Sequence, residues 1–355
     1  MRQGNIIGVD LAKNSFSVCV MNEHGRVIKR YNLVSRKKLL SVLRAHSGVI
    51  VMEACGGAHY WARELQLLGR ETRIIAGQFV KPFVKSNKND EIDAEAICEA
   101  ASRDQMRYVG TKSEEQQDIQ GVHRVRERLT KQRTALSNQI RGLLLEYGIT
   151  IPQGISYVRK RLMSIIEEHE LEHSALWKAT FLDLYEEFQD IDERLAKIDD
   201  RIKALARGNE TCQRLMKIPG VAEITATALY AAVGTGEQFK NGRQLAAWLG
   251  VTPRQHSTGG KELLLGISKR GNTQLRTLLI QGARSVAIAA ERKRDSAEPH
   301  KRSLNRTQRW LFEVGERRGG NRAVVALANK MARICCKVLQ GAEYKTQEEL
   351  IPLAA

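Results

Sequence analysis

The sequence predicts a mixed α/β domain at the N-terminus, a long helical region after it, and a mainly α-helical, basic domain at the C-terminus. Three observations lead to this prediction. Residues 6–76 alternate apolar strand-like runs with helical segments, residues 155–207 contain neither glycine nor proline, and the basic excess lies in the last third of the chain. We place the domains at 1–112, 113–210 and 211–340, followed by a tail at 341–355.

The charge of the chain indicates a polyanionic partner. Lysine and arginine number 57 against 40 acidic residues, which gives a net charge of +17. From Lys240 to Ala355 there are 22 basic and 9 acidic residues, or 22 − 9 = +13. Such an imbalance favours nucleic acid as the partner over a small metabolite.

The sequence contains no membrane or export signal. Apolar runs stay below the roughly 18 residues that cross a bilayer, and the first residues lack a secretory apolar segment. The six cysteines form no CxxC pair and no cluster with histidine at zinc spacing. We therefore expect a cytoplasmic protein with reduced thiols, no membrane partner and no structural zinc site.

The N-terminal domain shows a recognisable order of elements. Three strands, a helix, a strand, a helix, a strand and a further helix are expected at 6–10, 15–20, 27–31, 36–46, 49–53, 60–68, 73–76 and 90–103. The first seven follow one another as in a ribonuclease-H-like core.

Four carboxylates stand at special places in that order. Asp10 and Glu53 each end an apolar strand, while Asp90 and Asp93 lie three residues apart on one face of a helix. Each alone is explained as a turn residue or a helix cap. Together they would repel one another unless a cation neutralised them, and Mg²⁺ prefers such oxygen ligands. Two such ions can support phosphoryl transfer.

The middle of the chain predicts long helices. Residues 113–145 are polar and helix-forming, and a heptad seam follows at Phe181, Leu184, Phe188, Ile191, Leu195, Ile198, Ile202 and Leu205. The seam packs either on the chain's own core or on a second copy as a coiled coil. On the second interpretation we expect a homo-oligomer, a dimer or tetramer.

The C-terminal domain offers two candidate phosphate-binding features. The first is a turn typical of a helix-hairpin-helix, predicted at Ile218-Pro219-Gly220-Val221. Residues 251–261 form a glycine- and proline-containing loop in which Ser257 is accessible. Cations nearby could hold a phosphate and favour an activated hydroxyl. The candidate nucleic-acid contacts are Arg254, His256, Thr258, Lys261, Lys269 and Arg270.

These motifs resemble those of the DEDD-type insertion-sequence transposases. The resemblance rests on IGVDLAK at 7–13, MEACG at 52–56, NDEIDA at 89–94 and the block from Lys217 to Arg284. It implies a RuvC-like N-terminal domain whose metal-binding acids are Asp10, Glu53, Asp90 and Asp93. Glu91 competes with Asp90 for one of these places.

The resemblance also implies a mechanism. In that family a C-terminal serine attacks a DNA phosphodiester and forms a transient phosphoserine link, and a non-coding RNA from the element selects donor and target DNA. Carried over, the serine is Ser257, with the adjacent Thr258 as a rival. The implied activity is Mg²⁺-dependent excision and insertion of a mobile element.

Three other functions compete with this one. An actin-like or sugar-kinase ATPase also opens with a similar strand and turn, but it needs a second lobe that this sequence lacks. A junction-resolving nuclease would cut with the acids alone and use Ser257 only to bind phosphate. A nucleic-acid scaffold would use neither group catalytically.

Overall fold

The structure is a computed structural model that describes residues 4–84, 90–296 and 304–345, with residues 90 and 91 described by their backbone only. The chain divides into two compact units, Met1–Glu115 and Gln116–Ala355. Each unit has its own core, and each is described separately.

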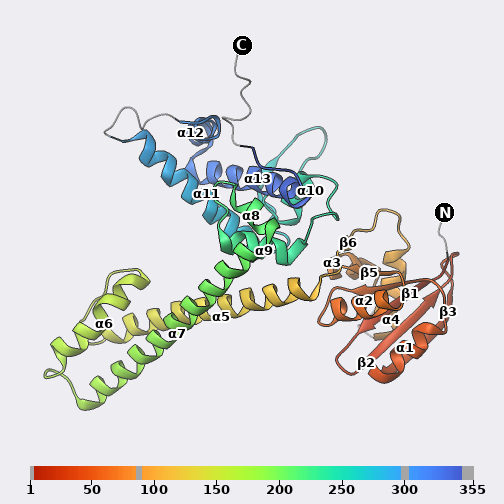
Figure 1. The fold of residues 1–355 in the computed structure, drawn as a ribbon, viewed down its shortest axis with the longest axis horizontal. Coiled ribbons are helices and arrows are strands. Elements are labelled where there is room, and N and C mark those ends of the chain that lie inside the picture. Colours follow the sequence, from red (N-terminus) through yellow and green to blue (C-terminus); the bar gives the residue numbers. More distant parts are fainter. Residues whose placement is uncertain (1–3, 85–89, 297–303, 346–355) are drawn as a thin grey trace, which may run out of the picture. The chain divides into compact units, whose positions relative to one another are not determined.

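Unit 1 is built on a six-stranded mixed sheet (Figure 1). Its strands are β1 (Ile6–Leu11), β2 (Ser15–Met21), β3 (Val27–Ser35), β4 (Val49–Glu53), β5 (Thr72–Ile75) and β6 (Tyr108–Val109). They are ordered β3-β2-β1-β4-β5-β6. β1, β4 and β5 run parallel, while β2, β3 and β6 each pair antiparallel to a neighbour.

Helices cover both faces of this sheet because alternate side chains of the central strands point to opposite sides. One face packs on α1 (Arg36–Arg44) and α2 (Ala58–Leu67), with Ile7, Val9, Met52 and Trp61 in one apolar core. The other face carries α3 (Gly77–Val80), a 3-10 turn η1 (Lys81–Phe83) and α4 (Asp90–Ala101).

The structure confirms the predicted α/β unit followed by a mostly helical body. The strand and helix order expected up to the helix at 90–103 is present. Sequence patterning missed α3, η1 and β6, because four, three and two residues are too short to show a period.

Unit 2 begins with three long helices: α5 (Glu114–Leu145), α6 (Ile155–His169) and α7 (Ala175–Gly208). Leucines and isoleucines of α5 and α6 enclose the heptad positions of α7, among them Phe181, Phe188 and Leu195. The seam is thus filled by helices of the same chain. The expected dimer or tetramer stays a prediction.

One carboxylate ties the three helices together. Asp192 of α7 accepts from Arg133 Nη1 of α5 at 2.7 Å and from Arg159 Nε of α6 at 2.6 Å. Burial alone would raise the pKa of Asp192, but the hydrogen bonds and charges of the two guanidinium groups outweigh it and lower that pKa.

The rest of unit 2 is a helical core with one β-hairpin. Its elements are α8 (Glu210–Met216), α9 (Glu223–Val233), α10 (Gly242–Trp248), β7 (Pro253–Gln255), β8 (Leu264–Ile267), α11 (Thr273–Arg294), α12 (Arg306–Arg318) and α13 (Gly320–Leu339). α13 is central, packing on α10, α11 and α12. α8 and α9 are joined at 217–222, where Gly220 has a φ of 85°. Whether this turn binds phosphate, as a helix-hairpin-helix turn would, stays a prediction.

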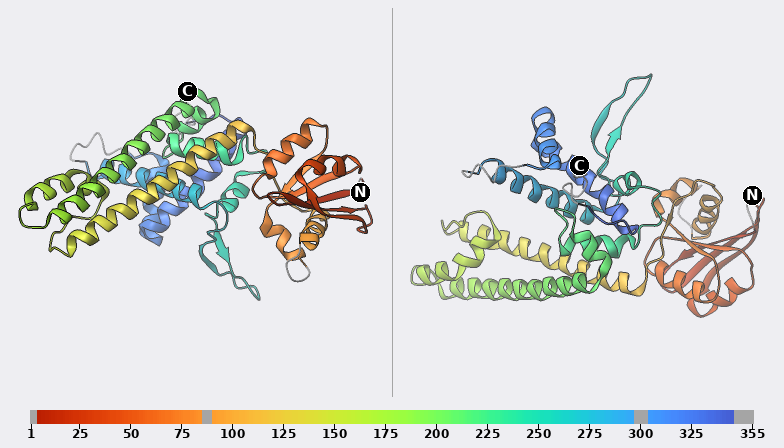
Figure 2. Two further views of the ribbon diagram at one scale, coloured as in Figure 1. Left: turned by 90° about the horizontal axis from the view of Figure 1, so that it is seen from below. Right: turned by 45° about the horizontal axis from the view of Figure 1, so that its top comes forward.

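The β7–β8 hairpin extends from unit 2 as a two-stranded ribbon (Figure 2, teal). Every residue from Pro253 to Gly266 is exposed, including Leu263, Leu264 and Leu265. No helix among the described residues is long and apolar enough to cross a membrane.

Gly8 should be intolerant of any side chain. A Cβ at Gly8 would lie 2.4 Å from the Ala94 carbonyl oxygen and 2.7 Å from Cys98 Sγ, so α4 would have to move off β1. We expect Gly8→Ala to destabilise unit 1 by about 1–3 kcal/mol, the usual cost of overpacking. Amide hydrogens of β1 and β4 should then exchange roughly 5- to 150-fold faster in the full-length chain.

The control is Gly56→Ala, because Gly56 lies in the same unit, has no left-handed backbone and has nothing within 4 Å of its added Cβ. Equal exchange rates in both variants would show that the close helix–strand contact is unimportant.

Candidate active site

Asp10 and Glu53 lie at neighbouring strand ends. β1 and β4 are parallel, and their register pairs Gly8 with Val51 and Val9 with Met52. Asp10 and Glu53 come one residue later on each strand. Since Val9 and Met52 point into the core beneath α1 and α2, the two carboxylates face the opposite side of the sheet.

The thiol of Cys55 lies close enough to both carboxylates for their charges to affect its pKa. Burial raises the pKa of Cys55, and the negative charges of Asp10 and Glu53 raise it further. Its Sγ also lies 3.8 Å from the Leu11 carbonyl oxygen. Both carboxylates therefore affect the same Cys55 side chain, as expected if Asp10 and Glu53 share one edge of the sheet.

Glu53 rests against the start of α3. A Cβ added to Gly77 would lie 2.4 Å from Glu53 Oε1 and 3.1 Å from its carboxyl carbon. Gly77 does not have a left-handed φ, so its backbone conformation is open to other residues. The absence of a side chain at this position is what makes room for the Glu53 carboxylate.

Asp93 lies on α4, the helix that packs on the same face of the sheet. Its neighbour Ala94 contacts β1 at Gly8, two residues before Asp10 on that face. Asp90 is the first residue of α4, but its side chain and that of Glu91 lie outside the described residues. Carboxylate oxygens are the donors that a hard divalent cation such as Mg²⁺ prefers. Among the side chains that the structure describes, however, Asp10, Glu53 and Asp93 do not form a group whose ligand atoms all lie within 4.8 Å of one another.

Ser257 lies in the β7–β8 hairpin of unit 2. The expected loop is in fact a hairpin that ends in a tight turn. Lys261 N–H donates to the Thr258 carbonyl at 3.1 Å, and the two residues between, Gly259 and Gly260, have φ of 56° and 77°. Positive φ at both central positions is the type I′ turn, whose twist suits a β-hairpin.

The hydroxyl of Ser257 has one described partner in the hairpin. Gln255 Nε2 donates to Ser257 Oγ at 3.1 Å. Ser257 is exposed. The hydroxyl is thus presented to solvent at the start of the turn, with an amide fixing its lone pair.

The base of the hairpin is fixed by a buried arginine. Arg276 of α11 is 8% exposed and donates to the carbonyls of Leu249 and Arg270 at 3.1 and 3.2 Å. These carbonyls lie on the two sides of the hairpin. Gly250 and Gly271 allow the chain segments to meet, since a Cβ on either would lie about 2 Å from a carbonyl oxygen of the opposite segment.

The predicted nucleic-acid contacts gather around this hairpin. Arg254, His256, Thr258 and Lys261 are exposed within it, and Lys269 and Arg270 are exposed at its base. The structure therefore brings these six residues together with Ser257 in unit 2. The acids belong to unit 1.

Two family models match the chain. One, described as a transposase of the DEDD IS110 type, matches residues 7–149. The other, described as the transposase IS116/IS110/IS902 family, matches residues 212–298. The first covers the strands and helix with the acids, and the second covers the hairpin with Ser257.

Curated relatives match over almost the whole chain. The transposase for insertion sequence element IS1111A of Coxiella burnetii is 47% identical over 339 residues, which cover 96% of this chain and 90% of that protein. The transposase for insertion sequence element IS1328 of Yersinia enterocolitica is 40% identical, covering 93% of this chain and 95% of that protein.

Gly77 gives a test of the acid site that leaves every carboxylate in place. Gly77→Ala should push the Glu53 carboxylate aside. If Glu53 is one of the metal-binding acids that the sequence predicts, its displacement by about 1 Å can cost roughly 100-fold in rate. We expect DNA cleavage to fall about 10- to 100-fold, while circular dichroism and the melting temperature stay near those of the wild type. Divalent-ion affinity should fall in parallel.

Gly142→Ala is the matched control, since Gly142 lies within α5 with nothing near its added Cβ. If Gly77→Ala cleaves DNA as fast as the wild type, Glu53 is not one of the metal-binding acids.

Proposed function

Because this chain belongs to the IS116/IS110/IS902 family of transposases, we propose that it excises and inserts its element through a Ser257–DNA intermediate assisted by the acids of unit 1. Transposases cut and rejoin DNA, and DNA is therefore the substrate. The observation that carries the finer proposal is the exposed Ser257 hydroxyl, held by Gln255 and surrounded by cations.

The chemistry balances as a transesterification. Ser257 Oγ attacks the phosphorus of a DNA phosphodiester, a new Oγ–P bond forms, and a deoxyribose oxygen leaves with the proton given up by the hydroxyl. A deoxyribose hydroxyl of another strand then attacks the phosphoserine and releases Ser257. The energy of the broken DNA bond is kept in the intermediate, so no nucleotide cofactor is needed.

The residues of unit 2 have separate tasks in this scheme. Arg254, Lys261, Lys269 and Arg270 would hold the phosphate backbone, and Gln255 would orient the nucleophile. In unit 1, Asp10, Glu53, Asp90 and Asp93 would hold Mg²⁺. A bound divalent cation stabilises negative charge on the oxygens of the reacting phosphate.

A covalent adduct separates this proposal from its rivals. Ser257→Ala should abolish the protein–DNA adduct that survives denaturation on a gel, and should lower excision by at least about a thousandfold. Asp10→Asn should also stop excision. Thr258→Ala is the control at the neighbouring hydroxyl and should still form the adduct.

Each rival gives another pattern. If Ser257→Ala still nicks DNA and the wild type forms no adduct, the protein is a nuclease that uses Ser257 only to bind phosphate. If both Ser257→Ala and Asp10→Asn excise normally, the protein is a scaffold. If only Thr258→Ala loses the adduct, Thr258 is the nucleophile.

We also propose that an RNA guide selects the DNA sites, as the resemblance to RNA-guided recombinases implies. The net charge of +17 and the exposed cations suit a nucleic-acid backbone. Base pairing would then read the sequence in place of the protein. RNA that co-purifies with the full-length protein should be one discrete species encoded beside its own gene.

Sequencing that RNA checks the prediction, with Ser257→Ala as a control that should retain it. A random sample of cellular RNA in both preparations would refute guided targeting.

A further inference from the structure

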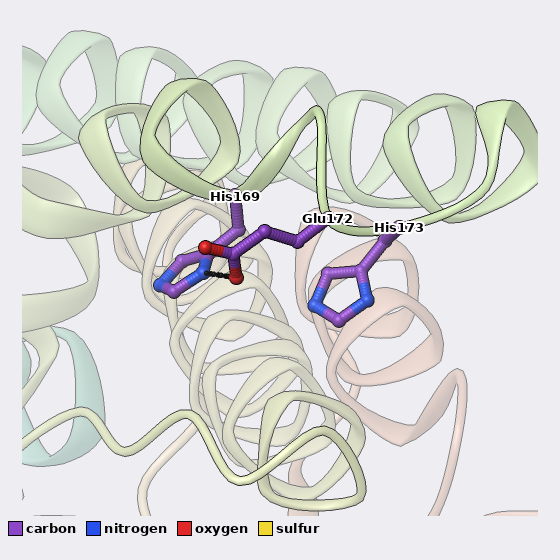
Figure 3. A group of neighbouring side chains, drawn as sticks. All are labelled: His169, Glu172 and His173. Carbon is purple, nitrogen blue, oxygen red and sulfur yellow. Dashed lines mark hydrogen bonds and ion pairs between the residues drawn. The ribbon is translucent and has the colours of Figure 1, made fainter.

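The turn between α6 and α7 brings together two imidazoles and a carboxylate (Figure 3). His169 is the last residue of α6, and Glu172 and His173 lie in the turn. One ligand atom from each lies within 4.8 Å of the other two. His169 Nδ1 and Glu172 Oε2 are 2.7 Å apart.

These separations approach those of a metal site. Zinc binds imidazole nitrogen and carboxylate oxygen at about 2.0–2.2 Å, so tetrahedral ligand atoms lie about 3.3–3.6 Å apart. The 2.7 Å hydrogen bond would open slightly and the His173 ring would approach slightly, by rotation of side chains alone. Three protein ligands leave a fourth position for water.

Packing holds His173 at this place. Its ring lies 5.0 Å from the ring of Tyr147, just after α5, and 4.7 Å from that of Trp177 in the first turn of α7. Ser174 caps α7 by accepting from Trp177 N–H at 3.1 Å. The imidazole is thus positioned by groups from two helices, which reduces the conformational entropy that metal binding would have to overcome.

The charge around the turn favours a cation. Residues 167–173 contain four glutamates and no lysine or arginine, in a chain whose net charge is +17. The nearby Lys178 pairs with one of them, Glu170. The local field therefore attracts metal ions and repels a phosphate backbone.

We propose that His169, Glu172 and His173 bind a zinc ion that fastens the end of α6 to the start of α7. Nitrogen ligands distinguish this site from the all-oxygen site of unit 1, so zinc is preferred here and Mg²⁺ there. The zinc site is independent of the transposition chemistry. Its role is to stiffen the turn, and its ligands bind only when the imidazoles are neutral.

The test uses the full-length chain without a histidine tag and with excess Mg²⁺ to occupy the oxygen site. Titration with Zn²⁺ should show one tight site, and Co²⁺ should give the visible absorption of a four-coordinate ion. His173→Gln and His169→Gln should each weaken zinc binding at least about 10-fold, the smaller effect expected for loss of a ligand.

Two controls make the result specific. His24→Gln removes an exposed histidine elsewhere and should bind zinc like the wild type, as should Asp10→Asn. If wild type and His169→Gln bind zinc equally, or the wild type shows no stoichiometric site, the proposal is wrong. His169→Gln keeps the test valid if His173→Gln unfolds the turn, because His169 makes no stacking contact with Trp177 comparable to that of His173.

Discussion

The direct contact of α4 with β1 at Gly8 is the constraint on which the acid site depends. Side chains normally separate a helix from the strand that it covers. Here the Ala94 carbonyl oxygen of α4 lies where a Cβ of Gly8 would otherwise be. Gly8 N–H also donates to Cys98 Sγ at 3.1 Å, which fixes the helix along the strand. Asp10 lies two residues after Gly8 on β1, and Asp93 lies next to Ala94 on α4. The distance between α4 and β1 at this contact therefore helps to determine the distance between Asp93 and Asp10.

Missing side chains also shape the base of the hairpin that carries Ser257 in unit 2. Gly250 and Gly271 let two segments touch, and Arg276 joins their carbonyls from below. Arg276 is a buried cation that donates hydrogen bonds to these two carbonyls and to the Thr273 hydroxyl. Buried charge is expensive unless it is well hydrogen-bonded. The base of the hairpin is therefore held by hydrogen bonds, whereas residues 253–266 of the hairpin are exposed.

The sequence predicted the helices and strands that are long enough to show a periodic pattern. It missed the contacts made by shorter elements. Apolar runs ending in Asp10 and Glu53 were enough to place two acids at one sheet edge, because parallel neighbours share that edge. Nothing periodic marks Gly77 beside Glu53, since the contact joins a strand end to a four-residue helix. The pair Gly259-Gly260 carries a turn signal, but strands of three and four residues are too short to show a period, so the sequence predicts only a loop there.

Two further differences have physical causes. The heptad seam of α7 has the spacing of an interchain coiled coil, and periodicity alone does not identify the partner; α5 and α6 fill it. The expectation of no structural zinc site rests on cysteine–histidine spacing and therefore misses His169, Glu172 and His173. Their i, i+3, i+4 spacing within five consecutive residues is the sequence signal that could have found them.

The exposure of the β7–β8 hairpin that carries Ser257 has a consequence for its stability. A two-stranded hairpin without a core is only marginally stable in water. Three neighbouring leucines, Leu263 just before β8 and Leu264 and Leu265 within it, are exposed to solvent. The stability of the hairpin in the free protein therefore depends on its base, where Arg276 joins the Leu249 and Arg270 carbonyls.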